Sequence, residues 1–520
     1  MGIPAWVFAH RDTATKRPNE ENIMAGEFDN RSPNSVENSN KKKSILSNIG
    51  VWRGSLPWNG LVFFVIALMG CTGGNALAIA SFNQGVENSN LNQDDKTIAD
   101  YTKAIELDVS KLAMAYNNRG NAYLNLHQYD KAITDCTKAI ELDPKLADAY
   151  LTRGVAYGEL KQYDKAIADY TRAIALDPND AEAYNRRGFA YLNLKQYDKA
   201  ITDCTRAIEL DPNDASAYNR RGFAYWELKQ FDKAILDYTK AIELDPEPAA
   251  AYYNRGAAYA NFQQYDKAIG DYTKAIELDP KLAKAYSSRG MAYFQLKQYD
   301  EAIADYTQAI ELDPKLDFAY NSRGNAYLRL KQYDIAIADY TKAISLKPND
   351  AYAYTNRGVV YWELKQYDEA IADCTKAIEL DPKSVWAYTN RGFTYANLKQ
   401  FDKAITDYTR AIELDPKSAQ AYYNRGVAYG KLKQFEKAIA DYTRAIELDP
   451  KLALAYNNRG NAYENLQQYD EAITDYTKAI ELDPKSAKDY FARGGAYLSM
   501  GKQKEAEADF AKAKMLNGEN

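Results

Sequence analysis

Residues 113–146 read AMAYNNRGNAYLNLHQYDKAITDCTKAIELDPKL, and this stretch decides the fold. Its Arg119-Gly120 pair recurs every 34 residues, without insertion, through twelve repeats that fill residues 113–520. The repeated arginines are Arg119, Arg153, Arg187, Arg221, Arg255, Arg289, Arg323, Arg357, Arg391, Arg425, Arg459 and Arg493. A fixed period of this length indicates an array of small helical or mixed units rather than several globular domains.

The first half of each repeat predicts a helix, from about Ala115 to Leu126. Tyr116, Arg119 and Tyr123 are spaced i, i+3 and i+7, which places them on one helical face. The pattern breaks near His127-Gln128, so we expect a turn there.

The second half of each repeat predicts a second helix, ending near Leu142. Asp130 stands at its start, where an acidic side chain favours a helix N-terminus. Asp143-Pro144 ends it, because proline disfavours the helical conformation in the residue before it. The apolar stripe of this helix consists of Ala132, Ile133, Cys136, Ala139 and Ile140. The repeat is therefore expected to be a helical hairpin.

Composition excludes several classes of function. The net charge is -6, from 66 basic and 72 acidic residues, so no strong basic field is available for nucleic acid. The chain has two histidines and four cysteines, without a CxxC pair or a zinc-ligand spacing. No nucleotide-binding, hydrolase or metalloprotease motif occurs. We therefore expect no enzyme activity, no catalytic residue, no metal and no cofactor.

The repeat resembles the tetratricopeptide (TPR) repeat, a 34-residue unit with the pattern W-x2-L-G-x2-Y…A-x3-F…P. Arg119 departs from this pattern because the family has Leu there, and Tyr116 replaces Trp. The resemblance covers residues 113–520 and implies an all-α solenoid, a right-handed superhelix of helix-turn-helix repeats. The matching residues in the first repeat are Tyr116, Arg119, Gly120, Tyr123, Ala132, Cys136 and Pro144.

Arg119 and Asp135 lie eight residues from the turn on either side, which places them level in an antiparallel hairpin. Asp recurs in the Asp135 position of all twelve repeats, down to Asp509. We predict a partly buried Arg–Asp pair in each hairpin or between neighbours, since arginine offers a carboxylate two donors. The alternative is an arginine stem that packs while its charged head reaches solvent.

Three cysteines, Cys136, Cys204 and Cys374, fall where Tyr or Phe stands in other repeats. We expect them to be buried core residues, too far apart for a disulfide.

The remaining chain divides into three segments. Residues 1–53 are polar, and we expect no fixed structure there. Residues 54–82 carry no charge and form a signal or membrane-anchor segment. Residues 83–112 are expected to be a linker followed by a lone helix from 93 to 112 that covers the apolar end of the array. At the other end Glu507 and Lys514 make the last helix polar on its outside, as a terminal repeat requires.

Three interpretations of the 54–82 segment stay open. Leu68-Met69-Gly70-Cys71 resembles a bacterial lipobox, which makes Cys71 a candidate for lipidation. Ala78-Ile79-Ala80 resembles a signal cleavage site. Leu61 to Phe82 could instead cross a bilayer uncleaved. All three place the array outside the cytoplasm, anchored or exported; the alternative is a buried helix in a cytoplasmic protein.

The first helices carry the candidate binding surface. Asn recurs in the Asn118 column, meaning the residues equivalent to Asn118, and this resembles the asparagine ladder in the TPR domain of O-GlcNAc transferase, where amides bind the backbone of an extended peptide. Asn suits this role because it donates and accepts. Neighbouring columns are aromatic or apolar. The candidate groove residues are Asn118, Arg186, Phe189, Arg220, Phe223, Trp226, Asn254, Met291, Phe294, Asn356, Trp362, Asn390, Phe393, Asn424 and Asn458.

These patterns favour a scaffold that binds a protein or an extended peptide and reaches a membrane through its N-terminal segment. The rival hypothesis is an assembly subunit that packs through its convex or end surfaces. For the asparagines the alternative role is solvation or capping of neighbouring helices. For the aromatic residues it is packing against the next first helix.

Overall fold

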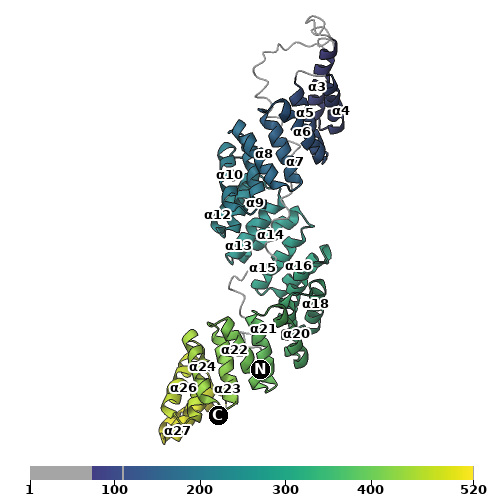
Figure 1. Ribbon diagram of the computed structural model, residues 1–520. Coiled ribbons are helices and arrows are strands. Elements are labelled where there is room, and N and C mark those ends of the chain that lie inside the picture. Colours follow the sequence, from purple (N-terminus) through teal and green to yellow (C-terminus); the bar gives the residue numbers. More distant parts are fainter. Residues whose placement is uncertain (1–72, 108–110, 519–520) are drawn as a thin grey trace. The chain divides into compact units, whose positions relative to one another are not determined.

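A computed structural model of the chain describes residues 73–107 and 111–518, which form helices α3 to α28 without a strand (Figure 1). Helices of odd number are the first helices of the hairpins, and those of even number are the second helices. The first helices are α3 (Gly73–Asn90), α5 (Leu112–Asn125), α7 (Ala147–Glu159), α9 (Ala181–Asn193), α11 (Ala215–Glu227), α13 (Ala249–Asn261), α15 (Ala283–Gln295), α17 (Asp317–Arg329), α19 (Ala351–Glu363), α21 (Val385–Asn397), α23 (Ala419–Lys431), α25 (Ala453–Asn465) and α27 (Ala487–Ser499). The second helices are α4 (Asp94–Glu106), α6 (Tyr129–Leu142), α8 (Tyr163–Leu176), α10 (Tyr197–Leu210), α12 (Phe231–Leu244), α14 (Tyr265–Leu278), α16 (Tyr299–Leu312), α18 (Tyr333–Leu346), α20 (Tyr367–Leu380), α22 (Phe401–Leu414), α24 (Phe435–Leu448), α26 (Tyr469–Leu482) and α28 (Gln503–Leu516). The predicted all-α solenoid of helix-turn-helix repeats is confirmed.

The helices form two compact units, one ending at Pro280 and the other beginning at Lys281, called unit 1 and unit 2 below. Within each unit, successive first helices contact one another, and the described second helices approach their successors less closely. Each stack therefore curves toward its first helices, which line its inner face.

The N-terminal end contains a further hairpin that the sequence did not predict. Helix α3 packs along α4 as the later helices pack in their pairs. Phe82 meets the ring of Tyr101 with 5.5 Å between centroids, and Asn88 Nδ2 donates to Asp100 Oδ2 at 2.6 Å. The expectation of a linker from residue 83 and a lone helix was wrong, because a few buried side chains of α3 hold it against α4.

The signal or anchor segment overlaps α3 only in part. Residues 1–72, Cys71 among them, lie outside the described residues. Residues 73–82 and the candidate cleavage site at Ala78-Ile79-Ala80 belong to α3, where Ala78 is fully buried. None of the described helices combines the length and hydropathy needed to cross a bilayer.

Each hairpin turn uses one residue in the left-handed region. Lys161 has φ of 57°, and the N–H of Gln162 donates to the carbonyl of Tyr157 at 2.8 Å, which satisfies the end of the first helix. A lysine, glutamine or histidine takes this position in eleven repeats, and Gly501 takes it in the last. The predicted break near His127-Gln128 is thus confirmed.

Inside each hairpin a glycine of the first helix faces a side chain of the second. A Cβ atom on Gly154 would lie 2.7 Å from Cε1 of Tyr170, and one on Gly120 would lie 2.7 Å from Cys136 Sγ. The two helices can approach this closely only because the glycine has no side chain. The three cysteines occupy the buried partner position and are free thiols, as predicted.

The predicted arginine–aspartate pair forms in all twelve hairpins. Arg153 donates from Nε to Asp169 Oδ2 and from Nη2 to Oδ1, both at 2.8 Å, and gives Nη1 to Thr137 of the preceding hairpin at 3.0 Å. The hydrogen bonds to Asp169 raise the pKa of the guanidinium. We call this arrangement the Arg–Asp clamp. Its third bond explains why arginine replaces the family's leucine, since it also ties neighbouring hairpins together.

The C-terminal end is only partly polar. Glu507 and Lys514 are exposed on α28, as expected for a terminal helix. Phe491 on α27, however, keeps 65% of its surface exposed, and Met515 on α28 keeps 61%.

Candidate binding surface on the first helices

Most amides of the predicted ladder are already engaged inside the array. Asn254 Nδ2 donates to Asn219 Oδ1 of the preceding first helix at 3.4 Å. Asn356 Nδ2 donates to Asn321 Oδ1 at 3.2 Å and to Asn325 Oδ1 at 3.1 Å. In both cases one acceptor, Asn219 or Asn321, belongs to the residue 35 positions before the donor. We call such an asparagine a closed amide.

The two outermost ladder amides are also engaged, with tyrosine hydroxyls. Asn458 Nδ2 lies 3.0 Å from Tyr423 Oη, and Asn118 Nδ2 lies 3.1 Å from Tyr101 Oη. The hypothesis that these asparagines are solvated or cap helices is therefore wrong for the engaged members, which bond to the neighbouring hairpin.

Asn390 and Asn424 differ from the rest. Their side chains are 9% and 6% exposed, and the Nδ2 atom of each has no hydrogen-bond partner. We call these two the open amides. Gln420 Nε2 donates to Asn424 Oδ1 at 2.8 Å, which fixes the orientation of that amide. A buried donor without a partner costs about 1–3 kcal/mol. Each Nδ2 atom is covered in this structure, so an acceptor from outside reaches it only when the side chains that cover it move aside.

The residue 35 positions earlier explains why these amides are open. It is Thr355 for Asn390 and Thr389 for Asn424. Thr355 Oγ1 donates to the carbonyl of Ala351 at 2.9 Å, and Thr389 Oγ1 bonds likewise within its own helix at 2.8 Å. These hydroxyls bond within their own helix. An asparagine at the same position accepts instead from the ladder amide of the next first helix. The sequence interpretation missed this acceptor column, although its change from Asn to Thr was visible beside the ladder.

An aromatic pair lies on the same helices as the open amides. Trp362 of α19 meets Phe393 of α21 with 5.0 Å between ring centroids, and Phe393 follows Asn390 by three residues on one face. The indole Nε1 of Trp362 and Oε1 of Glu363 are buried without partners. Burial raises the pKa of Glu363, whose other oxygen accepts from Tyr333 at 3.5 Å.

The predicted row of exposed aromatic residues is not continuous. Phe223 is 3% exposed and packs with Leu192 of the neighbouring first helix α9, which is the kind of packing considered as its alternative role. It also stacks on Trp226 of its own helix, with 6.4 Å between ring centroids. Phe294 packs on Tyr299 of its own hairpin at 5.4 Å. Met291 is partly buried on the same first helix. The expectation of exposure was wrong for Phe223, because it lies in a buried cluster with Leu192 and Ala200 of the preceding hairpin.

At two positions of unit 1, Arg186 and Arg220, the Asn118 column holds arginine. Arg220 donates from Nη1 to Asn185 Oδ1 at 2.8 Å, and its guanidinium lies 4.9 Å from the ring centroid of Phe189. Arg186 contacts Glu182 at 3.3 Å. Sequence reasoning placed these residues correctly on the first helices.

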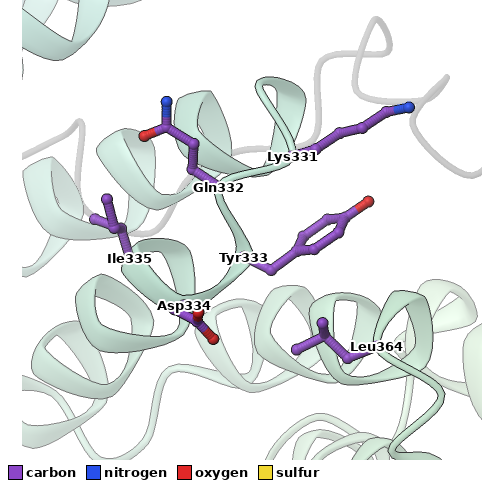
Figure 2. A pocket seen from close by; sticks show the side chains of 6 residues that line it. All are labelled: Lys331, Gln332, Tyr333, Asp334, Ile335 and Leu364. Carbon is purple, nitrogen blue, oxygen red and sulfur yellow. The ribbon is translucent and has the colours of Figure 1, made fainter.

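Outside this surface, a cavity of about 290 Å³ lies at the turn between α17 and α18, beside the end of α19. In Figure 2 its labelled side chains spread outward from the turn instead of converging on one point. It contains none of the predicted groove residues. The residues that line it are Lys331, Gln332, Tyr333, Asp334, Ile335 and Leu364. Within residues 73–107 and 111–518, no group of His, Cys, Asp or Glu could hold a metal ion.

Several solved structures are similar to parts or most of this chain. The crystal structure of YrrB, described as a TPR protein with an unusual peptide-binding site, is 30% identical, covering 35% of this chain and 95% of its own, with a TM-score of 0.30. That of MamA is 31% identical over 31% of this chain and 94% of its own, with a TM-score of 0.30. The Cut9–Hcn1 hetero-tetramer of the APC/C matches at 16% identity over 84% of this chain and 98% of its own, with a TM-score of 0.43.

Curated protein sequences give no match. Sequence models of repeat families match more than half of the chain. The model described as TPR repeat matches residues 324–365 and 394–433, and a second tetratricopeptide repeat model matches 305–338, 374–406 and 475–508. The first tetratricopeptide repeat model matches residues 113–146, 147–180, 181–214, 215–248, 249–282, 283–316, 351–384, 419–452 and 453–486. With its hairpins, its turn chemistry and these matches in agreement, the chain belongs to the tetratricopeptide repeat family.

Proposed function

We propose that the array is a non-catalytic scaffold whose inner face binds an extended peptide segment of a partner protein, and that α19, α21 and α23 hold the segment. The observation that carries this proposal is the pair of open amides, Asn390 and Asn424, on successive first helices. A peptide carbonyl supplies the acceptor that each lacks.

The spacing of the open amides suits an extended chain. Packed helices lie about 8–10 Å apart, and an extended chain advances about 3.3 Å per residue. Two equivalent residues on neighbouring first helices therefore meet carbonyls about three residues apart. An amide contacts backbone and not side chain, so this part of the surface selects little for sequence.

The aromatic pair supplies the selective contact. Trp362 and Phe393 offer apolar surface beside Asn390. A peptide with an apolar side chain near the contacted carbonyls fits this surface best.

The test closes the amides without removing them. Peptides would be selected on the full chain from a phage-displayed random library, and their affinities measured for variants. Thr355→Asn and Thr389→Asn place acceptors as Asn321 does for Asn356, so the double variant should bind at least about tenfold more weakly. Asn390→Ala with Asn424→Ala should lose binding as well.

Asn356→Ala is the matched control, because it removes a closed amide from an adjacent helix. It should leave peptide affinity within about twofold, since its amide contributes to packing and not to the ligand. Equal affinity in the control and in the double threonine variant would remove the open amides from the function.

Assembly through an end surface is the second candidate. The exposed Phe491 and Met515 on the two C-terminal helices favour it, because large exposed apolar side chains are candidates for contact with a partner. Sedimentation of the full chain beside Phe491→Ser would test it. A concentration-dependent mass that the variant abolishes would support assembly, and an unchanged monomer would remove it.

The proposal includes membrane tethering or export, supported by the charge-free stretch of residues 54–82 that follows basic residues. Fractionation of cells expressing the chain and its Cys71→Ser variant would test it. Membrane recovery lost in the variant supports lipidation; recovery of both in the cytoplasmic fraction contradicts tethering.

A further inference from the structure

Two arginines of unit 1 have no role in the hairpin clamps. Arg186 on α9 and Arg220 on α11 occupy equivalent positions in successive first helices. The arginine that follows each of them, Arg187 or Arg221, makes the Arg–Asp clamp of its repeat. The structural arginines of this chain bind an aspartate in the clamp, and Arg186 and Arg220 do not.

Arg220 lacks a carboxylate partner. It uses only Nη1, which donates to the backbone carbonyl of Asn185 at 3.2 Å and to Asn185 Oδ1 at 2.8 Å. Clamp arginines instead bind their aspartate through Nε and Nη2, the two nitrogens that Arg220 leaves without a hydrogen bond. Its hydrogen bonds therefore go to neutral oxygens, and the carboxylate of Asp214, which also acts on its charge, is bonded to Asn185 and not to the guanidinium.

The surroundings hold Arg220 in one orientation. Asn185 Nδ2 donates to Asp214 Oδ2 at 2.6 Å and to Ser216 Oγ at 2.7 Å, so its oxygen is directed at the arginine. The ring of Phe189 lies 4.9 Å from the guanidinium carbon. A preset guanidinium costs little further ordering when it binds a ligand.

Arg186 adds a second positive charge. Arg220 finds its acceptor in Asn185, 35 residues earlier. The residue 35 positions before Arg186 is Leu151, whose side chain has no hydrogen-bond acceptor. The contact of Arg186 is Glu182 Oε1 at 3.3 Å, where the glutamate is 59% exposed. Burial, and then the charge of Arg186, lower the pKa of Arg220 to about 10. Two neighbouring cations of which one is desolvated are stabilised by an anion between them.

We propose that Arg186 and Arg220 form an anion-binding site for an acidic group of a bound polypeptide, a carboxylate or a phosphoryl group. The site lies wholly in unit 1 and does not depend on the open amides of unit 2. Because the chain carries a net charge of -6, an acidic ligand gains nothing from the protein's overall field and must bind at a local site.

The test measures binding of fluorescent hexaglutamate to the full chain by anisotropy, with hexaglutamine as the neutral probe. Arg220→Gln keeps a donor for Asn185 and removes the charge. It should weaken hexaglutamate binding at least about tenfold, and Arg186→Gln should also weaken it. Arg220→Lys, which keeps the charge, should retain part of the affinity.

Arg206→Gln is the control, since this exposed arginine of α10 in unit 1 forms an ion pair with Glu209 on the surface, away from Arg186 and Arg220 in the sequence. It makes the same change in net charge and should leave binding unchanged. Equal losses in Arg206→Gln and Arg220→Gln, or equal binding of hexaglutamate and hexaglutamine, would overturn the proposal.

A phosphoserine peptide and its unphosphorylated form separate the two sources of the anion. Binding of the phosphorylated peptide that exceeds that of hexaglutamate and depends on Arg220 assigns a phosphoryl ligand. The reverse order assigns a carboxylate. If neither probe binds the unchanged chain, the site does not exist.

Discussion

Arg323 holds Asp339 with two parallel hydrogen bonds of 2.8 Å and spends its third nitrogen on Thr307 of the preceding hairpin at 2.9 Å. One side chain thereby joins three helices, with the arginine 16% and the aspartate 7% exposed.

Removal of this arginine should destabilise unit 2 strongly. Arg323→Leu leaves the carboxylate of Asp339 buried without a counter-charge, which costs roughly 3–5 kcal/mol. Thr307→Val removes one neutral partner and should cost about 1 kcal/mol. Urea denaturation followed by circular dichroism measures both. Equal midpoints for the leucine variant and the unchanged chain would show that the clamp does not stabilise the hairpin.

Two glycines in helices of unit 1 should respond to alanine in opposite directions. A Cβ at Gly222 would lie 2.9 Å from Cε1 of Tyr238 and 3.3 Å from the carbonyl of Ala234, so Gly222→Ala should destabilise by about 1–3 kcal/mol. Gly270, inside α14, has nothing within 4 Å of its Cβ position. Gly270→Ala should therefore stabilise by about 1 kcal/mol through helix propensity. Thermal unfolding of the two variants tests the pair, and a shift of the same sign in both would contradict it.

Glycine at the left-handed position of a hairpin turn should raise the stability of the array. Lys365 has φ of 59°, a conformation that costs a side-chain-bearing residue about 1–2 kcal/mol and glycine almost nothing. Because glycine also gains entropy in the unfolded chain, Lys365→Gly should stabilise by about 0.5–1 kcal/mol. Gly501→Lys, the reverse change at the last turn, should destabilise. Calorimetric midpoints decide the matter; a lower midpoint for Lys365→Gly would mean that the lysine side chain contributes contacts of its own.

Alkaline pH should unfold the array through its tyrosines. Burial raises the pKa of Tyr238, Tyr340 and Tyr408 above the ordinary value of 10.0. The folded state keeps these phenols neutral, whereas the unfolded chain ionises them near pH 10, so stability present below that pH is lost as pH rises further. The thermal midpoint should be nearly constant at neutral pH and fall above about pH 10. A thermal midpoint that stays constant up to about pH 12 would contradict this prediction.

Sequence periodicity was sufficient to predict the hairpins, because the spacing of Tyr116, Arg119 and Tyr123 is a property of one helix. The Arg–Asp clamp followed from counting residues to the turn. The helix α3 could not be predicted in this way, since its sequence does not repeat the pattern and tertiary contacts with α4, such as those of Phe82 and Asn88, hold it in place. Nor could sequence separate open from closed amides, because that depends on whether Thr355 bonds to its own helix.

The three buried thiols can report how often their own repeats open. Burial raises the pKa of Cys136, Cys204 and Cys374 to about 12, so none of them is a nucleophile while its hairpin stays folded. An alkylating reagent can then modify each only when its own repeat opens. The cysteines lie in the first, third and eighth repeats, and peptide mapping would resolve their modification rates separately. The chain thus contains native reporters of where its fraying begins and how far one opening spreads before the next repeat stops it.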